Sequence, residues 1–162
     1  MIVRPTIFVV AFFILASGCL SFVHPWGNLH NSTANTSILS GSEMPGEIRD
    51  VLQRKCADCH SNNTHWPIYS RMAPASWLVE HDVNAGRNAM NLSIWAGMSA
   101  DDRIAALARI AAEARSGEMP PKPYAMVHAA ALTQTEKQEI VAWARSERTR
   151  IRKQASDQRE RK

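Results

Sequence analysis

Cys56-Ala57-Asp58-Cys59-His60 is the stretch of sequence from which the rest of the chain can be interpreted. In one helical turn, residues three and four apart lie on the same face, so this spacing places Cys56, Cys59 and His60 together. The chain has 3 cysteines, and the remaining one, Cys19, lies in a distant apolar segment. The motif is therefore a compact group of two thiols and one imidazole.

This group fits the covalent attachment of one haem c. Two thiols at this spacing can add across the two vinyl groups of a haem edge, and a histidine directly after them then lies under the iron. A structural zinc site would need four ligands, and a thioredoxin-like dithiol would need a βαβ setting. A disulfide would leave His60 unexplained. We therefore expect Cys56 and Cys59 to bind the haem and His60 to ligate its iron.

Met119 is the candidate for the second axial iron ligand. It lies in Gly117-Glu118-Met119-Pro120-Pro121, between two predicted helices, where prolines restrict the backbone that presents the sulfur. A thioether ligand also stabilises reduced iron. The chain has 7 methionines, so hydrophobic packing is the competing interpretation. Met126, His128 and His81 are the alternative ligands.

Three aromatic residues after the motif are predicted to cover the haem: Trp66, Tyr69 and Trp77. Their rings can pack on its flat apolar surface while an N–H or O–H reaches a propionate or carbonyl. Ordinary core packing competes with this role for each of them. Arg87 is a candidate propionate partner, or else a solvated surface residue.

Helical periodicity dominates the rest of the chain, and no segment is a convincing strand, so the fold class is all-α. Four helices are expected in the region 45–147, which we take as the domain. The first follows Pro45 and runs into Cys56, the second runs from Pro74 towards Gly86, the third is capped by Ser99 and ends at Gly117, and the fourth begins at a capping box of Thr133 and Glu136.

Residues 1–23 are predicted to be a signal or membrane-anchor segment. The apolar run Ile7–Val23 is 17 residues long, at the lower limit for crossing a bilayer. Positive charge precedes it at Arg4, which orients the domain outside the cytoplasm. We expect an uncleaved anchor in a bacterial inner membrane, with the domain facing the periplasm. The alternatives are a soluble periplasmic protein after cleavage and a lipoprotein modified at Cys19.

The two segments that flank the domain are a polar linker and a basic tail. Residues 24–44, rich in Asn, Ser, Thr and Gly, form the predicted linker. The net charge of +4 is concentrated at the other end, because residues 145–162 hold eight Lys or Arg against three acids. The tail, 148–162, suits an anionic membrane surface or an acidic protein patch, or is a solvated helix end. Nucleic acid is not the expected partner of an exported chain.

The sequence around the motif resembles the bacterial haem-binding domain family of small cytochrome-c-like proteins. The resemblance covers roughly residues 44–145 and implies a fold and a methionine loop like those of class I cytochromes c, with no settled partner. Ile68 departs from it, because members often have an aromatic residue there. The matching residues are Cys56-x-x-Cys59-His60-Ser61-Asn62-x-Thr64-x-Trp66-Pro67-x-Tyr69-Ser70, Ala73-Pro74-x-Ser76-Trp77-Leu78-Val79, Gly86-Arg87, Asn91-x-Ser93-x-Trp95, Met119-Pro120-Pro121-x-Pro123-Tyr124, His128, Ala131-Leu132-Thr133 and Trp143.

Three functions are compatible with these features. The first is a one-electron carrier, not an enzyme, that exchanges electrons with redox partner proteins. The second is a haem enzyme or a gas or redox sensor with a displaceable sixth ligand, and the third is a haem subunit of a larger membrane complex. A peroxidase would need a distal His–Arg pair, and His81 and Arg87, six residues apart, do not share a helical face.

Overall fold

The computed structural model describes residues 3–32 and 37–161, and no strand occurs among them. The ends of the predicted N-terminal segment and tail (1–2 and 162) and four residues of the predicted linker (33–36) lie outside the described residues. The all-α class is confirmed for the described residues. The elements are α1 (Val3–Leu20), α2 (Gly46–Lys55), α3 (Ala57–His60), η1 (Ile68–Arg71), α4 (Ala75–Ala89), η2 (Leu92–Gly97), α5 (Ala100–Ser116), α6 (Lys122–His128) and α7 (Gln134–Glu160).

The long helices begin and end where local chemistry satisfies their free backbone groups. Ser99 accepts a hydrogen bond from the backbone N–H of Asp102 and starts α5, which ends where Gly117 adopts a left-handed conformation with φ 75°. Thr133 and Glu136 form both bonds of the predicted capping box at the start of α7. The predicted starts of these two helices are confirmed.

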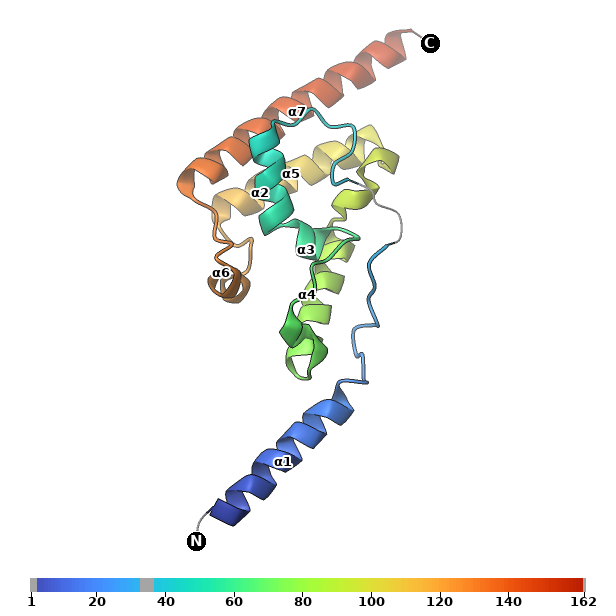
Figure 1. Cartoon of the computed structure of the whole chain (residues 1–162). Helices are drawn as coiled ribbons and strands as arrows, with labels where there is room; N and C mark the ends of the chain where they lie inside the picture. Colours follow the sequence, from blue (N-terminus) through green and yellow to red (C-terminus); the bar gives the residue numbers. More distant parts are fainter. Residues whose placement is uncertain (1–2, 33–36, 162) are drawn as a thin grey trace.

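The core lies where α2, α5 and α7 meet. Helices α5 and α7 pack along each other, and α2 crosses α7 beside them (Figure 1). Leu52, Leu107 and Ile140 are almost completely buried at this junction. Helix α3 continues from the end of α2 and packs against α4, which extends away from the three core helices (Figure 1).

The predicted linker contributes to this core. Ile38 and Leu39 are buried, and the N–H of Leu39 donates a hydrogen bond of 2.9 Å to the carbonyl of Leu92. At the end of the segment, Trp143 donates from its indole nitrogen to the carbonyl of Glu43 at 2.9 Å. Ile38 and Leu39 are adjacent apolar residues in a polar stretch and form no helical or strand pattern, so the sequence did not indicate that they are buried.

The predictions of an N-terminal membrane segment and of an inner-membrane location are corrected by the structure. Among residues 3–32 and 37–161, no helix is both long and apolar enough to cross a membrane. Helix α1 ends at Leu20, so only the part of the apolar run from Ile7 to Leu20 is helical. At about 1.5 Å per residue, that part is about 21 Å long, less than the hydrocarbon core of a bilayer.

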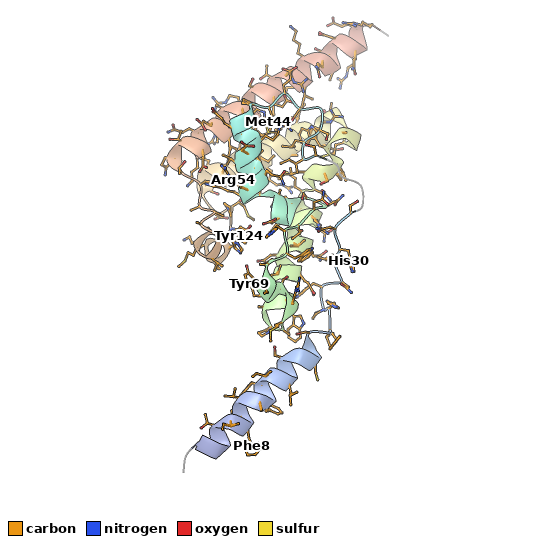
Figure 2. The ribbon with its side chains drawn as sticks, viewed as in Figure 1. Phe8, His30, Met44, Arg54, Tyr69 and Tyr124 are labelled. Carbon is orange, nitrogen blue, oxygen red and sulfur yellow. The ribbon has the colours of Figure 1, made fainter. Side chains whose placement is uncertain are left out.

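The end of α1 is joined to the start of α4. The hydroxyl of Ser21 accepts a hydrogen bond from the N–H of Ala73, and Trp77 donates from its indole nitrogen to the carbonyl of Val23. His24 Nδ1 lies 2.6 Å from Oε1 of Glu80, a buried side chain of α4. The rest of α1 extends away from the other helices, and Phe8, labelled in Figure 2, is 74% exposed.

Candidate functional site

The motif is held in a single turn at the junction of α2 and α3. Helix α2 ends at Lys55, and the N–H of His60 donates to the carbonyl of Cys56 at 3.0 Å. Ala57 is buried beneath this turn, so its orientation is fixed by the core. Cys56, Cys59 and His60 therefore lie within one helical turn, as their spacing predicts.

Helix α4 approaches the motif so closely that only glycine fits at one position. A Cβ atom on Gly86 would lie 2.5 Å from the carbonyl oxygen of Cys59 and 2.9 Å from its Cβ. Because the nearest atom belongs to the backbone, no side-chain movement could relieve this clash. Gly86 thus allows α4 to cover the second cysteine directly.

One ring nitrogen of His60 is hydrogen-bonded, and this bond determines which of the two nitrogens carries the proton. Nδ1 lies 2.9 Å from the carbonyl oxygen of Met90. A carbonyl can only accept, so the neutral ring carries its proton on Nδ1 and has a free lone pair on Nε2. This arrangement orients histidine ligands in many metal sites, because the bonded N–H fixes both the tautomer and the ring.

A cavity of about 290 Å³ lies beside the motif, and the predicted haem ligands lie in its wall. Cys56, Cys59, His60 and Met119 all line it. The rest of its wall is largely apolar, as in most cofactor sites. The apolar residues of the wall come from α2, α4, η2, α5, α7 and the connections between helices: Leu52, Ala85, Ala89, Met90, Leu92, Ile110, Ala114, Pro120, Pro121, Leu132 and Ile140.

Burial keeps the two thiols protonated. It raises the pKa of Cys56 to about 12, and the nearby Cys59 adds to this shift. Burial also raises the pKa of Cys59 to about 11, with smaller contributions from Asp82 and Asp58. Both groups are therefore neutral thiols near pH 7, when little thiolate is present.

The alternative axial ligands do not line this cavity. Met119 is 40% exposed, whereas Met126 is 84% exposed and outside the cavity wall. The Nε2 atom of His128 is bonded to the hydroxyl of Tyr69, and Nδ1 of His81 lies 3.1 Å from Asp82. Met119 is thus the only one of the four candidates beside the motif.

The three predicted haem-covering residues lie in different places. Tyr69 lines a second cavity of about 280 Å³, which shares Cys59 and Tyr124 with the first. Trp66 donates to the side chain of Asn31, and Trp77 donates to Val23. Trp66 thus bonds to the predicted linker and Trp77 to the end of the N-terminal segment. Neither tryptophan lines a cavity, and their role at a haem stays a prediction.

The candidate propionate partner Arg87 is engaged elsewhere. Its guanidinium donates to the carbonyl of Ser61 at 2.8 Å and to the hydroxyl of Thr64 at 3.0 Å, which stabilises the loop after the motif. Arg109, which donates to the carbonyl of Ala89 at 2.8 Å, is the arginine among the residues that line the first cavity.

Sequence reasoning missed the contribution of Asp58 and Tyr124. The Tyr124 hydroxyl donates to Asp58 Oδ2 at 2.8 Å. The pKa of Tyr124 is raised mainly by burial and secondly by this hydrogen bond. Tyr124 also stacks on His128 with ring centroids 4.4 Å apart. The family resemblance includes Tyr124, but only the position of α6 reveals its partner.

The donor set of the cavity fits a haem. Two thiols, an imidazole with a free Nε2 and a thioether line one apolar space, which defines the chain as a helical haem-binding protein. A family model described as a haem-binding domain matches residues 15–146, and the chain belongs to that family. No curated protein and no solved structure matches the chain.

Proposed function

We propose that the protein is a c-type cytochrome that carries one haem and transfers single electrons. The observation that carries the proposal is the convergence of Cys56, Cys59, His60 and Met119 on one cavity. When bound, the haem supplies an iron that alternates between Fe(III) and Fe(II). The residues of the chain attach it, ligate it and exclude water from it.

Attachment uses the two cysteine thiols. Each S–H would add across one vinyl C=C bond of the haem, with an S–C bond formed and the hydrogen passed to the other vinyl carbon. The addition is redox-neutral and needs no oxidant. Cys56 and Cys59, whose thiol pKa values are raised by burial, both line the cavity, where the haem edge would lie.

His60 and Met119 are the residues that would ligate the iron. Met90 holds the proton of His60 on Nδ1 and leaves Nε2 for the iron. The soft sulfur of Met119 would stabilise Fe(II) and raise the reduction potential. Two protein ligands leave no open position for a substrate, so electron exchange with redox partner proteins is the function that this ligand set supports best.

A second candidate function is a sensor or enzyme in which the sixth ligand is displaced. The exposure of Met119, 40%, favours it, because an exposed thioether in a loop exchanges more readily than a buried one. Carbon monoxide distinguishes the two functions. A carrier binds it slowly after reduction, whereas a protein with a displaceable ligand binds it at once.

The test is to express the chain with a haem-attachment system and to measure its mass and visible spectrum. We expect the mass of the polypeptide plus one haem after denaturation, and the weak red Fe–S charge-transfer band in the ferric protein. A denatured mass equal to that of the bare polypeptide would contradict covalent attachment. Free carbon monoxide binding without the band would favour the sensor or enzyme.

A further inference from the structure

The connection between α5 and α7 carries Met119 and is bonded to the motif region at separate points. Tyr124 donates to Asp58, which lies between the two motif cysteines. Farther along, the carbonyl of Ala131 accepts a bond of 2.8 Å from the ammonium of Lys55, directly before Cys56. Residues of the motif region that are neither the proposed attachment cysteines nor the proposed iron ligand thus hold the segment that presents the sixth ligand.

The bond between Asp58 and Tyr124 is pre-organised on the Asp58 side. The other carboxylate oxygen of Asp58, Oδ1, accepts from the backbone N–H of His65 at 2.9 Å, and the carbonyl of Asp58 accepts from the Thr64 hydroxyl at 2.7 Å. Asp58 is therefore held by two hydrogen bonds besides the one from Tyr124. A carboxylate acceptor also makes a stronger bond than a neutral one.

Tyr124 lies where it can act on the haem cavity. It lies on α6 and lines both cavities, the second of them together with Tyr69, and both tyrosines are labelled in Figure 2. Met119 lies five residues earlier, with Pro120 and Pro121 in between, and α6 begins at Lys122. Prolines restrict the intervening backbone, so a bond at Tyr124 limits the movement of Met119.

We propose that the bond between Asp58 and Tyr124 is a clasp that holds Met119 on the iron, with both residues as positioning residues for the sixth ligand. The inference rests on the proposed ligation by His60 and Met119. Opening the clasp frees the connection, so Met119 dissociates more often and an external ligand reaches the iron sooner.

The experiment measures cyanide binding to the ferric, haem-loaded full chain in Tyr124→Phe. This change removes a single oxygen atom and keeps the aromatic ring. We expect cyanide association to become about tenfold faster, the equivalent of one hydrogen bond to a charged group, and the Fe–S band to weaken. Haem content and far-ultraviolet circular dichroism should match the wild type, because the attachment residues are untouched.

The chain has 2 tyrosines, so Tyr69→Phe is the matched control. It loses an exposed bond to His128 that does not reach the motif. We expect the rate to stay within about twofold of the wild type, since exposed neutral bonds contribute little. Equal acceleration in both tyrosine variants would overturn the clasp, because the effect would then not depend on Asp58.

A double-mutant cycle tests whether the two residues act together. Asp58→Ala should accelerate cyanide binding as Tyr124→Phe does, and the double variant should be no faster than either, because both remove the same bond. Asp58→Asn keeps one acceptor oxygen but loses the charge, so its rate should lie between those of the wild type and Asp58→Ala. Additive acceleration in the double variant would overturn the proposal.

The result for the wild type separates the clasp from the proposed function. If the wild type shows the Fe–S band and Tyr124→Phe leaves band and rate unchanged, the clasp is wrong and the function stands. If the wild type never shows the band, Met119 is not the ligand, and both the ligation and the clasp are overturned. If Tyr124→Phe unfolds at a lower denaturant concentration but keeps the Fe–S band and the wild-type cyanide rate, the bond only stabilises the fold, and the positioning role is overturned.

Discussion

At the scale of single residues, Met119 decides between an electron carrier and an open haem site. It lines the cavity with His60 and both motif cysteines. In Met119→Ala we expect the Fe–S band to disappear, the reduction potential to fall and carbon monoxide to bind quickly, because the soft ligand that favours Fe(II) is gone. The thioether attachment should remain, since neither cysteine is altered.

Met126→Ala is the control for this prediction. It makes the same change in a residue that is 84% exposed and does not line the cavity. Its spectrum and potential should equal those of the wild type. A band that persists in Met119→Ala and is lost in Met126→Ala would mean that the wrong methionine had been assigned.

The motif thiols have a pH dependence that can be measured before haem attachment. Burial raises the pKa of Cys56 to about 12 and that of Cys59 to about 11, so the reactive thiolate forms only at high pH. In a Cys19→Ala background, we expect alkylation of the folded apoprotein at pH 8 to be about a hundredfold slower than in urea, where an ordinary pKa of about 8.5 returns. The rate should continue to rise up to at least pH 10.

The comparison with urea is also the check on this prediction. Thiolate concentration, and hence the rate of alkylation, rises about tenfold per pH unit below the pKa of a thiol. A rate that levels off near pH 9 in the folded protein, or equals the rate in urea, would show that the motif is exposed in the absence of haem.

At the scale of helices, the start of α7 depends on one hydroxyl. Thr133 accepts from the N–H of Glu136, whose carboxylate accepts in turn from the N–H of Thr133 at 2.7 Å. Thr133→Ala should lower the free energy of unfolding by about 1 kcal/mol, measured by urea denaturation, because the helix start loses its cap.

Thr149→Ala is the matched control in the same helix. The Thr149 hydroxyl donates to the carbonyl of Arg145 in the middle of α7 and caps nothing. Alanine has the higher helix propensity, so stability should stay the same or rise by a few tenths of a kcal/mol. Equal losses in the two variants would contradict a special role for the cap.

The helices show which parts of the fold the sequence could predict. Caps, such as Ser99 and the Thr133 box, depend on neighbours three residues away, so their positions were predictable and are confirmed. The short helix α6 and the burial of Leu39 depend on contacts with distant segments, which no local pattern encodes. The prediction of a membrane anchor was wrong, because the apolar run continues three residues beyond the end of α1 and its helical part is too short to cross a bilayer.

The same distinction applies to the candidate site. The order and spacing of Cys56, Cys59 and His60 are local, so their common face followed from the sequence. The bond of His60 to the carbonyl of Met90 and the bond of Tyr124 to the carboxylate of Asp58 join residues far apart in the sequence. They depend on how α3 packs against its neighbours, which no local pattern predicts. Met119 needed both kinds of information: the sequence placed it between two helices, and the structure brings it to the cavity.

At the scale of the whole molecule, α7 joins the core to the basic end of the chain. The predicted tail starts at residue 148, but Ile151 is buried at 4% exposure and belongs to the core. Arg150 donates to both carboxylate oxygens of Glu147, which is itself 2% exposed. The folded unit therefore extends at least one helical turn into the predicted tail.

Two truncations separate the part of the tail that packs from the part that does not. Removing residues 148–162 deletes Ile151 and leaves the buried Glu147 without Arg150, so we expect a loss of about 2–5 kcal/mol in the free energy of unfolding. Removing residues 152–162 deletes mostly exposed side chains and should change stability by less than about 0.5 kcal/mol, with the haem spectrum unchanged. Ile151→Ala should reproduce much of the larger loss, and Arg152→Ala should have no effect. If the shorter truncation destabilised the protein as much as the longer one, the exposed end of α7 would have to pack on the core, contrary to its exposure.

Any binding of the intact end to an acidic partner should weaken with salt, because exposed charges are screened over about 10 Å at 0.1 M.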